Sequence, residues 1–423
     1  MKKIKVLAFC MAVFMVLSGC SAIMQVYAER KEALAGSSDA PDSAADPGTQ
    51  TGPDAAEGEG GGLSIPPADT NSDPGSAPSN VHPEEPAPTE QAAGAITMPR
   101  STDVLELPII GATGIATVEM QIRENTSANS AIVATVPSGT AFRILAEDGA
   151  WWEVQNDTVR GWVQHRFCMV NLPDVIPSII YNNANTYQSR FVSSGKSIPN
   201  ITGQALYNGR SFNPRLNREE YIVPVLYAMS KKIAVAQRSA LAQNDTLVIY
   251  EGYRPSSVQQ KVVNELTAFS QADPEVLAGI NSYPWSMDWF IAVGVSNHQM
   301  GYAIDVTLAK VVEKEVRQNS KYSYDAILKY TEYQMPTVIH ELSAAAATFA
   351  QPVTSSSDTE WRSAAFAESM NEAAKVMQKY CTDAGLSPLA SEWWHFNDLA
   401  AMNEIQVNPS TGDFDLPEIL SVD

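Results

Sequence analysis

The chain has 423 residues, a formal net charge of −20 and a hydrophobic share of 44%. This acidic balance argues against a nucleic-acid partner, because proteins that bind phosphate backbones concentrate positive charge. The length allows two or three domains with ordinary hydrophobic cores. The chain has only four cysteines and no Cys-x-x-Cys spacing, which excludes a disulfide-rich scaffold. We expect Cys168 and Cys381 to be free thiols.

The first twenty residues have the composition of an export signal. A lysine-rich start precedes an apolar run over 6–17, too short to span a bilayer comfortably, and small residues follow. Residues 17–20, Leu-Ser-Gly-Cys, resemble the bacterial lipobox, in which the cysteine is acylated. The resemblance implies a signal peptide over 1–19 and a protein anchored on the extracytoplasmic face of the cell membrane through lipidated Cys20. A plain signal peptide with an incidental cysteine, or an uncleaved anchor, is the alternative.

Residues 20–99 are predicted to form a disordered acidic tether. Between residues 32 and 99 the chain has twelve Asp or Glu and no Lys, Arg or aromatic residue, and it is rich in Gly, Pro and Ser. Such a segment cannot bury enough apolar surface to offset the entropy lost on ordering, and its charges repel one another. We therefore expect the tether to provide reach rather than chemistry.

Residues 100–174 are predicted to form a small all-β barrel. Four short apolar segments follow one another between Gly, Pro and Asp turns, over 133–136, 141–145, 151–154 and 161–163. An Ile-Arg strand, a Pro-x-Gly-Thr turn, an Asp-Gly-x-Trp-Trp hairpin and a Gly-Trp-Val strand resemble the bacterial SH3-like domain. In that family such domains often bind cell-wall peptides, which implies peptidoglycan as a partner. Alternatively, Trp151, Trp152 and Trp162 only fill the core. We expect His165 and Cys168 to have no role beyond packing.

Residues 175–423 are predicted to form one α+β domain, because helical and strand patterns interleave over about 250 residues. The apolar spacing predicts helices over 220–243, 256–270 and 359–384, and strands over 246–250 and 302–308. Gly385 is expected to end the third helix.

The chain has five histidines, and two of them, His298 and His395, have an acidic residue at a spacing that suits a metal site. His298 and Asp305 flank Gly301, where the chain can fold back so that both side chains converge. Glu392 precedes His395 by three residues, a spacing that can place a carboxylate beside a metal held by the imidazole. Two His, one Asp and an additional Glu fit a catalytic zinc site with three protein ligands and one open position. Each motif alone also occurs without any function.

Three motifs resemble those of the D-alanyl-D-alanine dipeptidase (VanX) family of zinc peptidases, in the same order along the chain. They are Tyr253-Arg254-Pro255, Ser296-x-His298-x-x-Gly301-x-Ala303-x-Asp305 and Glu392-Trp393-Trp394-His395-Phe396. The resemblance covers about residues 176–400 and implies an α+β zinc D,D-peptidase domain. It also implies that Zn²⁺ is bound by His298, Asp305 and His395.

The same resemblance assigns the catalytic roles. It implies that Glu392 is the general base and that Arg254 stabilises the transition state, although a buried structural ion pair is the alternative for Arg254. The stretch over 318–357 does not align with the family, and we expect it to frame the substrate. Within this stretch, His340 begins a broken H-E-x-x-H motif in which residue 344 is Ala, so we expect His340 to be structural.

Three functions follow from these patterns. The first is a zinc-dependent D-alanyl-D-alanine dipeptidase, because Trp393-Trp394 resembles the dipeptidase branch where carboxypeptidase relatives carry Pro-Trp. The second is a D,D-carboxypeptidase that trims peptidoglycan stem peptides, which export favours, since D-Ala-D-Ala outside the cell occurs at the ends of these peptides. The third is a non-catalytic wall-binding lipoprotein.

Overall fold

The computed structural model describes residues 98–101, 103–183, 191–319 and 321–422. All of them belong to one compact unit, Ala77–Asp423. The expected signal peptide, Cys20 and all but the last two residues of the expected tether lie outside the described residues. Within the described ranges, no helix is both long enough and apolar enough to cross a membrane.

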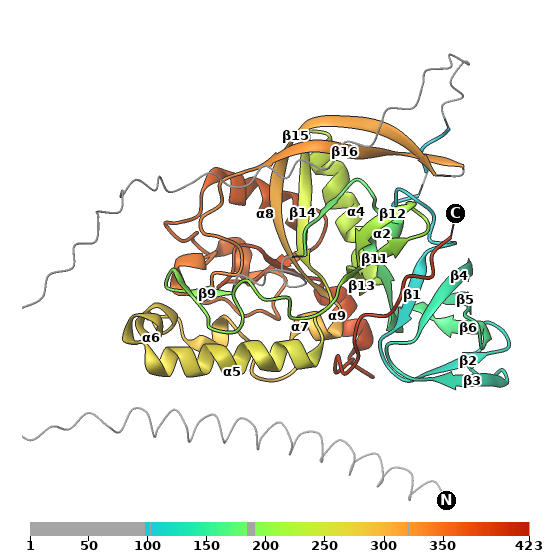
Figure 1. The fold of residues 1–423 in the computed structure, drawn as a ribbon, viewed down its shortest axis with the longest axis horizontal. Coiled ribbons are helices and arrows are strands. Elements are labelled where there is room, and N and C mark those ends of the chain that lie inside the picture. The colour runs from blue at the N-terminus through green and yellow to red at the C-terminus, as the bar shows by residue number, and fades with distance from the viewer. Residues whose placement is uncertain (1–97, 102, 184–190, 320, 423) are drawn as a thin grey trace, which may run out of the picture. The chain divides into compact units, whose positions relative to one another are not determined.

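The first sheet has eight strands, in the order β13-β7-β1-β4-β5-β6-β2-β3, and every pair is antiparallel (Figure 1). Its strands are β1 (Thr113–Ala116), β2 (Met120–Arg123), β3 (Ile132–Val136), β4 (Ala141–Asp148), β5 (Trp151–Gln155), β6 (Arg160–Gln164), β7 (Cys168–Asn171) and β13 (Pro224–Leu226). The four strands expected from the sequence are therefore confirmed as β3, β4, β5 and β6.

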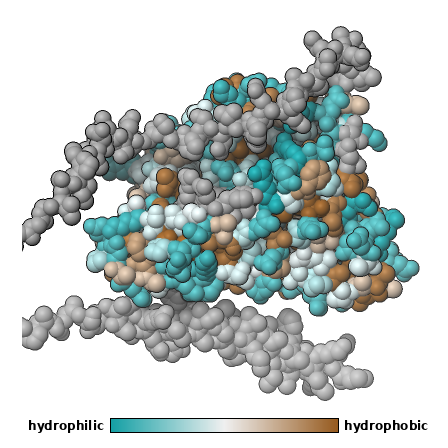
Figure 2. Space-filling model, in the orientation of Figure 1, coloured by the Kyte–Doolittle hydropathy of each residue, from teal (hydrophilic) through white to brown (hydrophobic). Residues whose placement is uncertain are grey.

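Alternating side chains of these strands build the barrel core. Buried and partly exposed residues alternate along β4, β5 and β6, as expected for strands with one buried face. Trp152 is fully buried, whereas Trp151 and Trp162 are only half-buried. On the outer face, Ile132 and Val133 of the edge strand β3 are exposed, and Figure 2 shows apolar atoms at this end of the barrel.

The second sheet follows the order β17-β18-β15-β14-β8, and β16 also pairs with β15. Its strands are β8 (Ile180–Tyr181), β14 (Asp245–Glu251), β15 (Ala303–Asn319), β16 (Tyr322–Glu332), β17 (Ser387–Pro388) and β18 (His395–Asn397). The parallel pair is β14 with β8, and the other pairs are antiparallel. β15 and β16 form a long hairpin that extends beyond the other strands (Figure 1).

Helices accompany the second sheet, and two small hairpins complete the fold. The helices are α2 (Leu172–Val175), α4 (Tyr227–Leu241), α5 (Ser256–Ala272), α6 (Pro274–Ile280), α7 (Asn297–Met300), α8 (Glu372–Asp383) and α9 (Leu399–Ile405). The hairpins are β9 (Val192–Ser193) with β10 (Lys196–Ser197) and β11 (Arg210–Asn213) with β12 (Arg218–Tyr221). α4 packs on β14, α8 packs on β15, and the two helices contact each other. The mixed α and β content expected after residue 174 is confirmed.

Two expected helices are too long, and one expected strand is too short. The helix expected over 220–243 begins at Tyr227, because the apolar run before it forms β13, where Pro224 occupies the first strand position and needs no N–H partner. The helix expected over 359–384 begins at Glu372, where the side chain of Asn371 accepts a hydrogen bond from the Ala374 N–H and caps the helix. It ends before Gly385, as expected. Gly385 has a φ of 91°, in the left-handed region that glycine commonly adopts after the end of a helix.

The strand expected over 302–308 continues to Asn319, since β16 pairs along its extension. The helix expected over 256–270 and the strand expected over 246–250 are confirmed as α5 and β14. The two cysteines in the described ranges, Cys168 and Cys381, are buried free thiols, as expected.

The barrel and the following region share a sheet and a packed interface. β13 comes from beyond the expected boundary at residue 174, yet it pairs with β7. The ring of Trp152 lies against the ring of Tyr227 on α4, with 4.7 Å between their centroids. The hydroxyl of Tyr227 donates a hydrogen bond to Glu147 Oε2 at 3.0 Å. Trp152 therefore fills the barrel core and also holds α4.

Candidate metal centre

The register of the second sheet places Asp305 between two other buried polar residues. On β15, Asp305 lies opposite Glu251 of β14 on one side and opposite His395 of β18 on the other. All three side chains are buried. The sheet therefore brings together residues that are far apart in the sequence.

His298 reaches the same place from the short helix α7. Ser296 caps this helix: its hydroxyl accepts a hydrogen bond from the Gln299 N–H, and the Gln299 side chain accepts one from the Ser296 N–H. Gly301 ends the helix at a φ of 81°, which favours glycine, and a Cβ there would collide with Met169 of β7. This tight turn directs the chain into β15 and brings His298 beside Asp305, as the sequence predicts.

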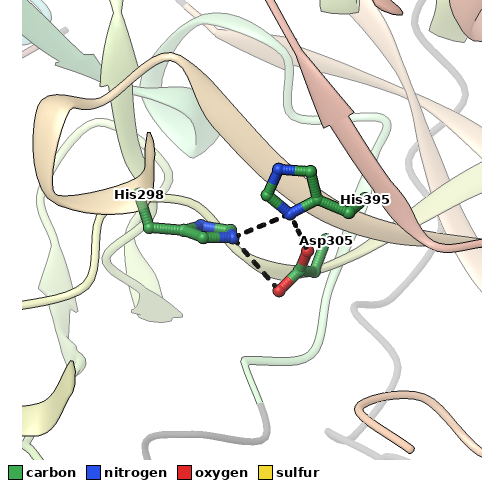
Figure 3. Close-up of side chains that lie close together, drawn as sticks. All are labelled: His298, Asp305 and His395. Atoms are coloured by element: carbon green, nitrogen blue, oxygen red, sulfur yellow. Dashed lines mark hydrogen bonds and ion pairs between the residues drawn. The ribbon is translucent and has the colours of Figure 1, made fainter. Parts of the chain in front are cut away.

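Potential metal-ligand atoms of three residues converge in the site, as Figure 3 shows. His298 Nε2 lies 3.2 Å from His395 Nδ1 and 3.4 Å from Asp305 Oδ2, and His395 Nδ1 lies 3.1 Å from Asp305 Oδ1. Tetrahedral zinc with ligands at about 2.0–2.1 Å places neighbouring ligand atoms about 3.3 Å apart. The spacing of the three side chains therefore fits a zinc ion.

Each of the two histidines has one inner ring nitrogen, which faces the cluster, and one outer ring nitrogen, which points away from it. The hydrogen-bond partners of the outer nitrogens indicate how the inner nitrogens are protonated. His298 Nδ1 lies 2.7 Å from the Gly252 carbonyl oxygen, and His395 Nε2 lies 2.9 Å from Asn397 Oδ1. Both oxygens only accept, so both outer nitrogens donate, and the inner nitrogens of the neutral rings present lone pairs to each other. Two lone pairs at 3.2 Å repel unless a cation lies between them. Zinc-binding histidines show this arrangement, with a hydrogen bond at the outer nitrogen.

A chain of side chains holds Asn397 in place. Asn297 Nδ2 donates to the same Asn397 Oδ1 at 2.9 Å, and Asn297 Oδ1 accepts from the Tyr302 hydroxyl at 2.7 Å. These contacts turn the amide oxygen of Asn397 toward His395. They fix the ring orientation of His395, which is the role of the outer partners of metal ligands.

Glu392 lies beside this cluster. Its Oε2 is 3.6 Å from His395 Nδ1, and the side chain is buried. Burial raises the pKa of Glu392 to about 8, against the opposing charge of His395. A carboxyl group with a pKa near neutrality can both accept and return a proton.

Arg254 follows the end of β14 and is also buried. Its Nη2 lies 3.0 Å from Glu251 Oε2 and 3.9 Å from Asp305 Oδ2, and Glu251 Oε1 accepts a hydrogen bond from the Tyr207 hydroxyl at 3.2 Å. The alternative expected for Arg254, a buried ion pair, is therefore present. Because Glu251 orients the guanidinium next to Asp305, the ion pair and a role at the site are compatible.

Two further residues, Glu251 and His340, lie beside this cluster. The sequence assigned Glu251 no role and His340 only a structural one, at most at the rim of the pocket. Glu251 and His340 form a second possible ligand set with Asp305. Arg254 Nη2 lies close to two members of this second set, Glu251 and Asp305, and already supplies a positive charge there. The signal for Glu251 was its place at the end of a buried strand, two residues before Tyr253-Arg254-Pro255. For His340, which lies in the stretch that does not align with the family, the sequence offered no signal beyond the broken motif.

The charge on Asp305 is stabilised by its neighbours. Burial alone would raise the pKa of this carboxyl, but the imidazoles of His298, His340 and His395, when protonated toward it, hold it well below its usual range. Asp305 therefore presents an ionised carboxylate to the two inner nitrogens. The donor set, two imidazoles and one carboxylate, suits zinc.

Comparison with known proteins identifies the barrel. None of the curated proteins matches the chain. The family model of the bacterial SH3 domain matches residues 119–167, which contain β2 to β6 and the turn that follows them. Residues 119–167 of the expected barrel are therefore identified as a bacterial SH3 domain.

Proposed function

We propose that this protein is a zinc-dependent D,D-peptidase that hydrolyses the bond between two D-alanine residues in peptidoglycan metabolism. The observation that carries the proposal is the convergence of His298 Nε2, His395 Nδ1 and the Asp305 carboxylate at 3.1–3.4 Å. The D-Ala-D-Ala specificity rests on the motif resemblance. The presence of the SH3 domain supports a role at the cell wall.

Zinc bound by His298, Asp305 and His395 would supply a Lewis acid for the scissile carbonyl and make water more acidic. The protein's own groups supply the rest. Glu392 takes the proton from the attacking water and delivers it to the nitrogen of the leaving amine. Arg254 places a fixed positive charge where negative charge develops on the carbonyl oxygen, and its burial strengthens this effect.

Substrate length separates two forms of the proposal. Trp393 and Trp394 are buried, and their rings meet edge to face with centroids 5.2 Å apart. They support the dipeptidase, since this Trp-Trp pair resembles the dipeptidase branch. The SH3 domain, with the proposed lipid anchor at Cys20 on the extracytoplasmic membrane face, supports a D,D-carboxypeptidase acting on stem peptides. A non-catalytic wall-binding lipoprotein is disfavoured because Glu392 and the three proposed ligands are all retained.

One assay tests the proposal. The purified protein, residues 20–423, is loaded with zinc and offered D-Ala-D-Ala or a pentapeptide that ends in it, and released D-alanine is measured. We expect release from the dipeptide and, with Glu392→Gln, a rate at least about 100-fold lower. Release from the pentapeptide alone would replace the dipeptidase by the carboxypeptidase. No release from either substrate by the wild-type protein would contradict both.

A further inference from the structure

His340 has an unusual backbone conformation and a closely packed side chain. Its φ is 61°, in the left-handed region that Gly adopts readily and that other residues seldom adopt. The ring is 1% exposed and lies on Phe191, with centroids 4.9 Å apart and planes inclined by 25°. The ring of Trp394 meets it edge-on at 6.0 Å. Backbone strain of this kind tends to persist at functional sites, where the surrounding structure holds it.

The hydrogen bond of His340 reaches a proposed zinc ligand. His340 Nε2 lies 3.1 Å from Asp305 Oδ2, and because a carboxylate oxygen only accepts, Nε2 carries the hydrogen of this contact. The other ring nitrogen, Nδ1, is buried, and the described residues offer it no hydrogen-bond partner. The aromatic packing and the single polar contact therefore direct the ring toward Asp305.

The two oxygens of Asp305 have different neighbours. Oδ1 lies 3.1 Å from His395 Nδ1, while Oδ2 lies 3.4 Å from His298 Nε2, receives the hydrogen bond from His340 and lies 3.9 Å from Arg254 Nη2. Outer partners of a metal ligand fix its orientation, and their removal typically costs about 10–100-fold in metal affinity.

We infer that His340 is a positioning residue that holds the Asp305 carboxylate in its metal-binding orientation through the Nε2 hydrogen bond. The residue acts through Asp305 rather than on the substrate. The inference rests on the proposed function, because it takes Asp305 to be a zinc ligand. It gives His340 a role that the broken H-E-x-x-H motif did not predict.

Three substitutions at one position separate positioning from backbone fit. In His340→Gln the amide nitrogen takes the place of Nε2, whereas in His340→Asn it takes the place of Nδ1, and His340→Gly has no side chain. If His340 positions Asp305, the His340→Gln variant is expected to keep its zinc affinity within about 3-fold of wild type. The His340→Asn and His340→Gly variants are expected to lose about 10–100-fold in zinc affinity. A role confined to backbone conformation requires the opposite order, because Gly and Asn suit a positive φ better than Gln.

Zinc affinity is measured by competition with a chromogenic chelator on the full-length exported protein, residues 20–423. Thermal unfolding of the metal-free variants confirms that they are folded, and the visible absorption of the Co²⁺-loaded proteins reports the ligand geometry. We expect wild type and His340→Gln to share one Co²⁺ spectrum and His340→Asn to differ. Wild-type affinity in His340→Asn, or equal losses in the Gln and Gly variants, would overturn the inference.

The same experiment keeps this inference distinct from the proposed function. If wild type binds zinc and releases D-alanine but all three variants match it, the positioning role is wrong and the proposed function stands. If wild type binds no zinc, the proposed function is wrong and the positioning role falls with it.

Discussion

The SH3 domain and the region that holds the proposed metal site differ in how each uses the residues it buries. In the barrel, strands β4, β5 and β6 pair with their neighbours along the chain, and the buried side chains are mainly apolar. In the region of the proposed metal site, residues between 251 and 395 converge, and the sheet encloses carboxylates, imidazoles and a guanidinium. Buried charges are costly unless they compensate one another. The stability of the barrel thus depends on apolar packing, whereas the stability of the site depends on opposite charges that compensate one another.

The difference is chemical rather than architectural, because the two regions share a sheet through β13 and β7. Substitutions in the barrel are expected to change stability with little effect on zinc binding. Substitutions in the site are expected to change activity or zinc binding. Removing one charged group also leaves its partner buried and uncompensated, which lowers stability. Four predictions test this contrast.

The largest effect is expected at Arg254. Arg254→Met removes a positive charge from the site and leaves Glu251 buried without its partner. We expect kcat for D-alanine release to fall about 10²–10³-fold and the free energy of unfolding to fall by about 3–5 kcal/mol. Steady-state kinetics and urea unfolding measure the two effects.

A matched double variant separates the two roles of Arg254. Glu251→Gln neutralises the orphaned carboxylate, so Arg254→Met with Glu251→Gln is expected to recover much of the lost stability but none of the lost activity. Recovery of activity together with stability would show that Arg254 is only a structural ion-pair partner.

Trp152 tests the barrel side of the contrast. Trp152→Ala removes a fully buried ring that packs on Tyr227 of α4. We expect the free energy of unfolding, measured in urea, to fall by about 3–5 kcal/mol. Zinc affinity at a temperature where the variant is folded is expected to be unchanged. Loss of zinc binding without loss of stability would contradict the separation between the regions.

Asn397 tests whether the outer hydrogen bond of His395 matters for the metal. Asn397→Leu removes the acceptor from His395 Nε2, and we expect zinc affinity to fall about 10–100-fold. Asn397→Asp keeps an acceptor and adds a negative charge, so its zinc affinity is expected to equal or exceed that of wild type. Competition with a chelator measures both, and equal affinities in the Leu and Asp variants would contradict the proposed role of Asn397.

Glu106, at the junction of the two regions, carries the smallest expected effect. Its carboxylate accepts hydrogen bonds from the backbone and hydroxyl of Ser178, and burial raises its pKa from 4.5 to about 7. The folded protein therefore binds a proton that the unfolded chain releases, so this group's contribution to stability is present below pH 4.5 and is lost as the pH rises through about 7.

Glu106→Gln removes this dependence on pH. Because the residue is partly exposed, we expect the variant to gain on the order of 1 kcal/mol relative to wild type between pH 4.5 and pH 8. Urea unfolding of both proteins across this range measures the difference. If the difference in the free energy of unfolding between variant and wild type does not change with pH, the raised pKa of Glu106 is contradicted.

The sequence predicted the barrel well because its strands are local. Turns such as Asp148-Gly149 mark the strand ends, and β4 to β6 pair in chain order, so no long-range information was needed. The helix expected over 359–384 was too long, because alanine content alone does not show that Asn371 caps the helix within it.

The site was only partly predictable for a related reason. Few histidines and three ordered motifs singled out His298, Asp305, Glu392 and His395, and the structure brings these residues together. Glu251 and His340 were missed. Glu251 depends on the register of β14 against β15, and His340 depends on the path of the chain after β16. Neither the register nor the path is visible in local patterns.

The central claim is that the buried cluster is a zinc site. It is tested most directly by counting the zinc that the purified protein retains after dialysis against metal-free buffer, by elemental analysis. We expect one zinc per chain in wild type and in Glu392→Gln, whose carboxylate is not a ligand, and none in His298→Ala with His395→Ala. A wild-type protein without zinc, or a double variant that keeps it, would show that the cluster is not a zinc site.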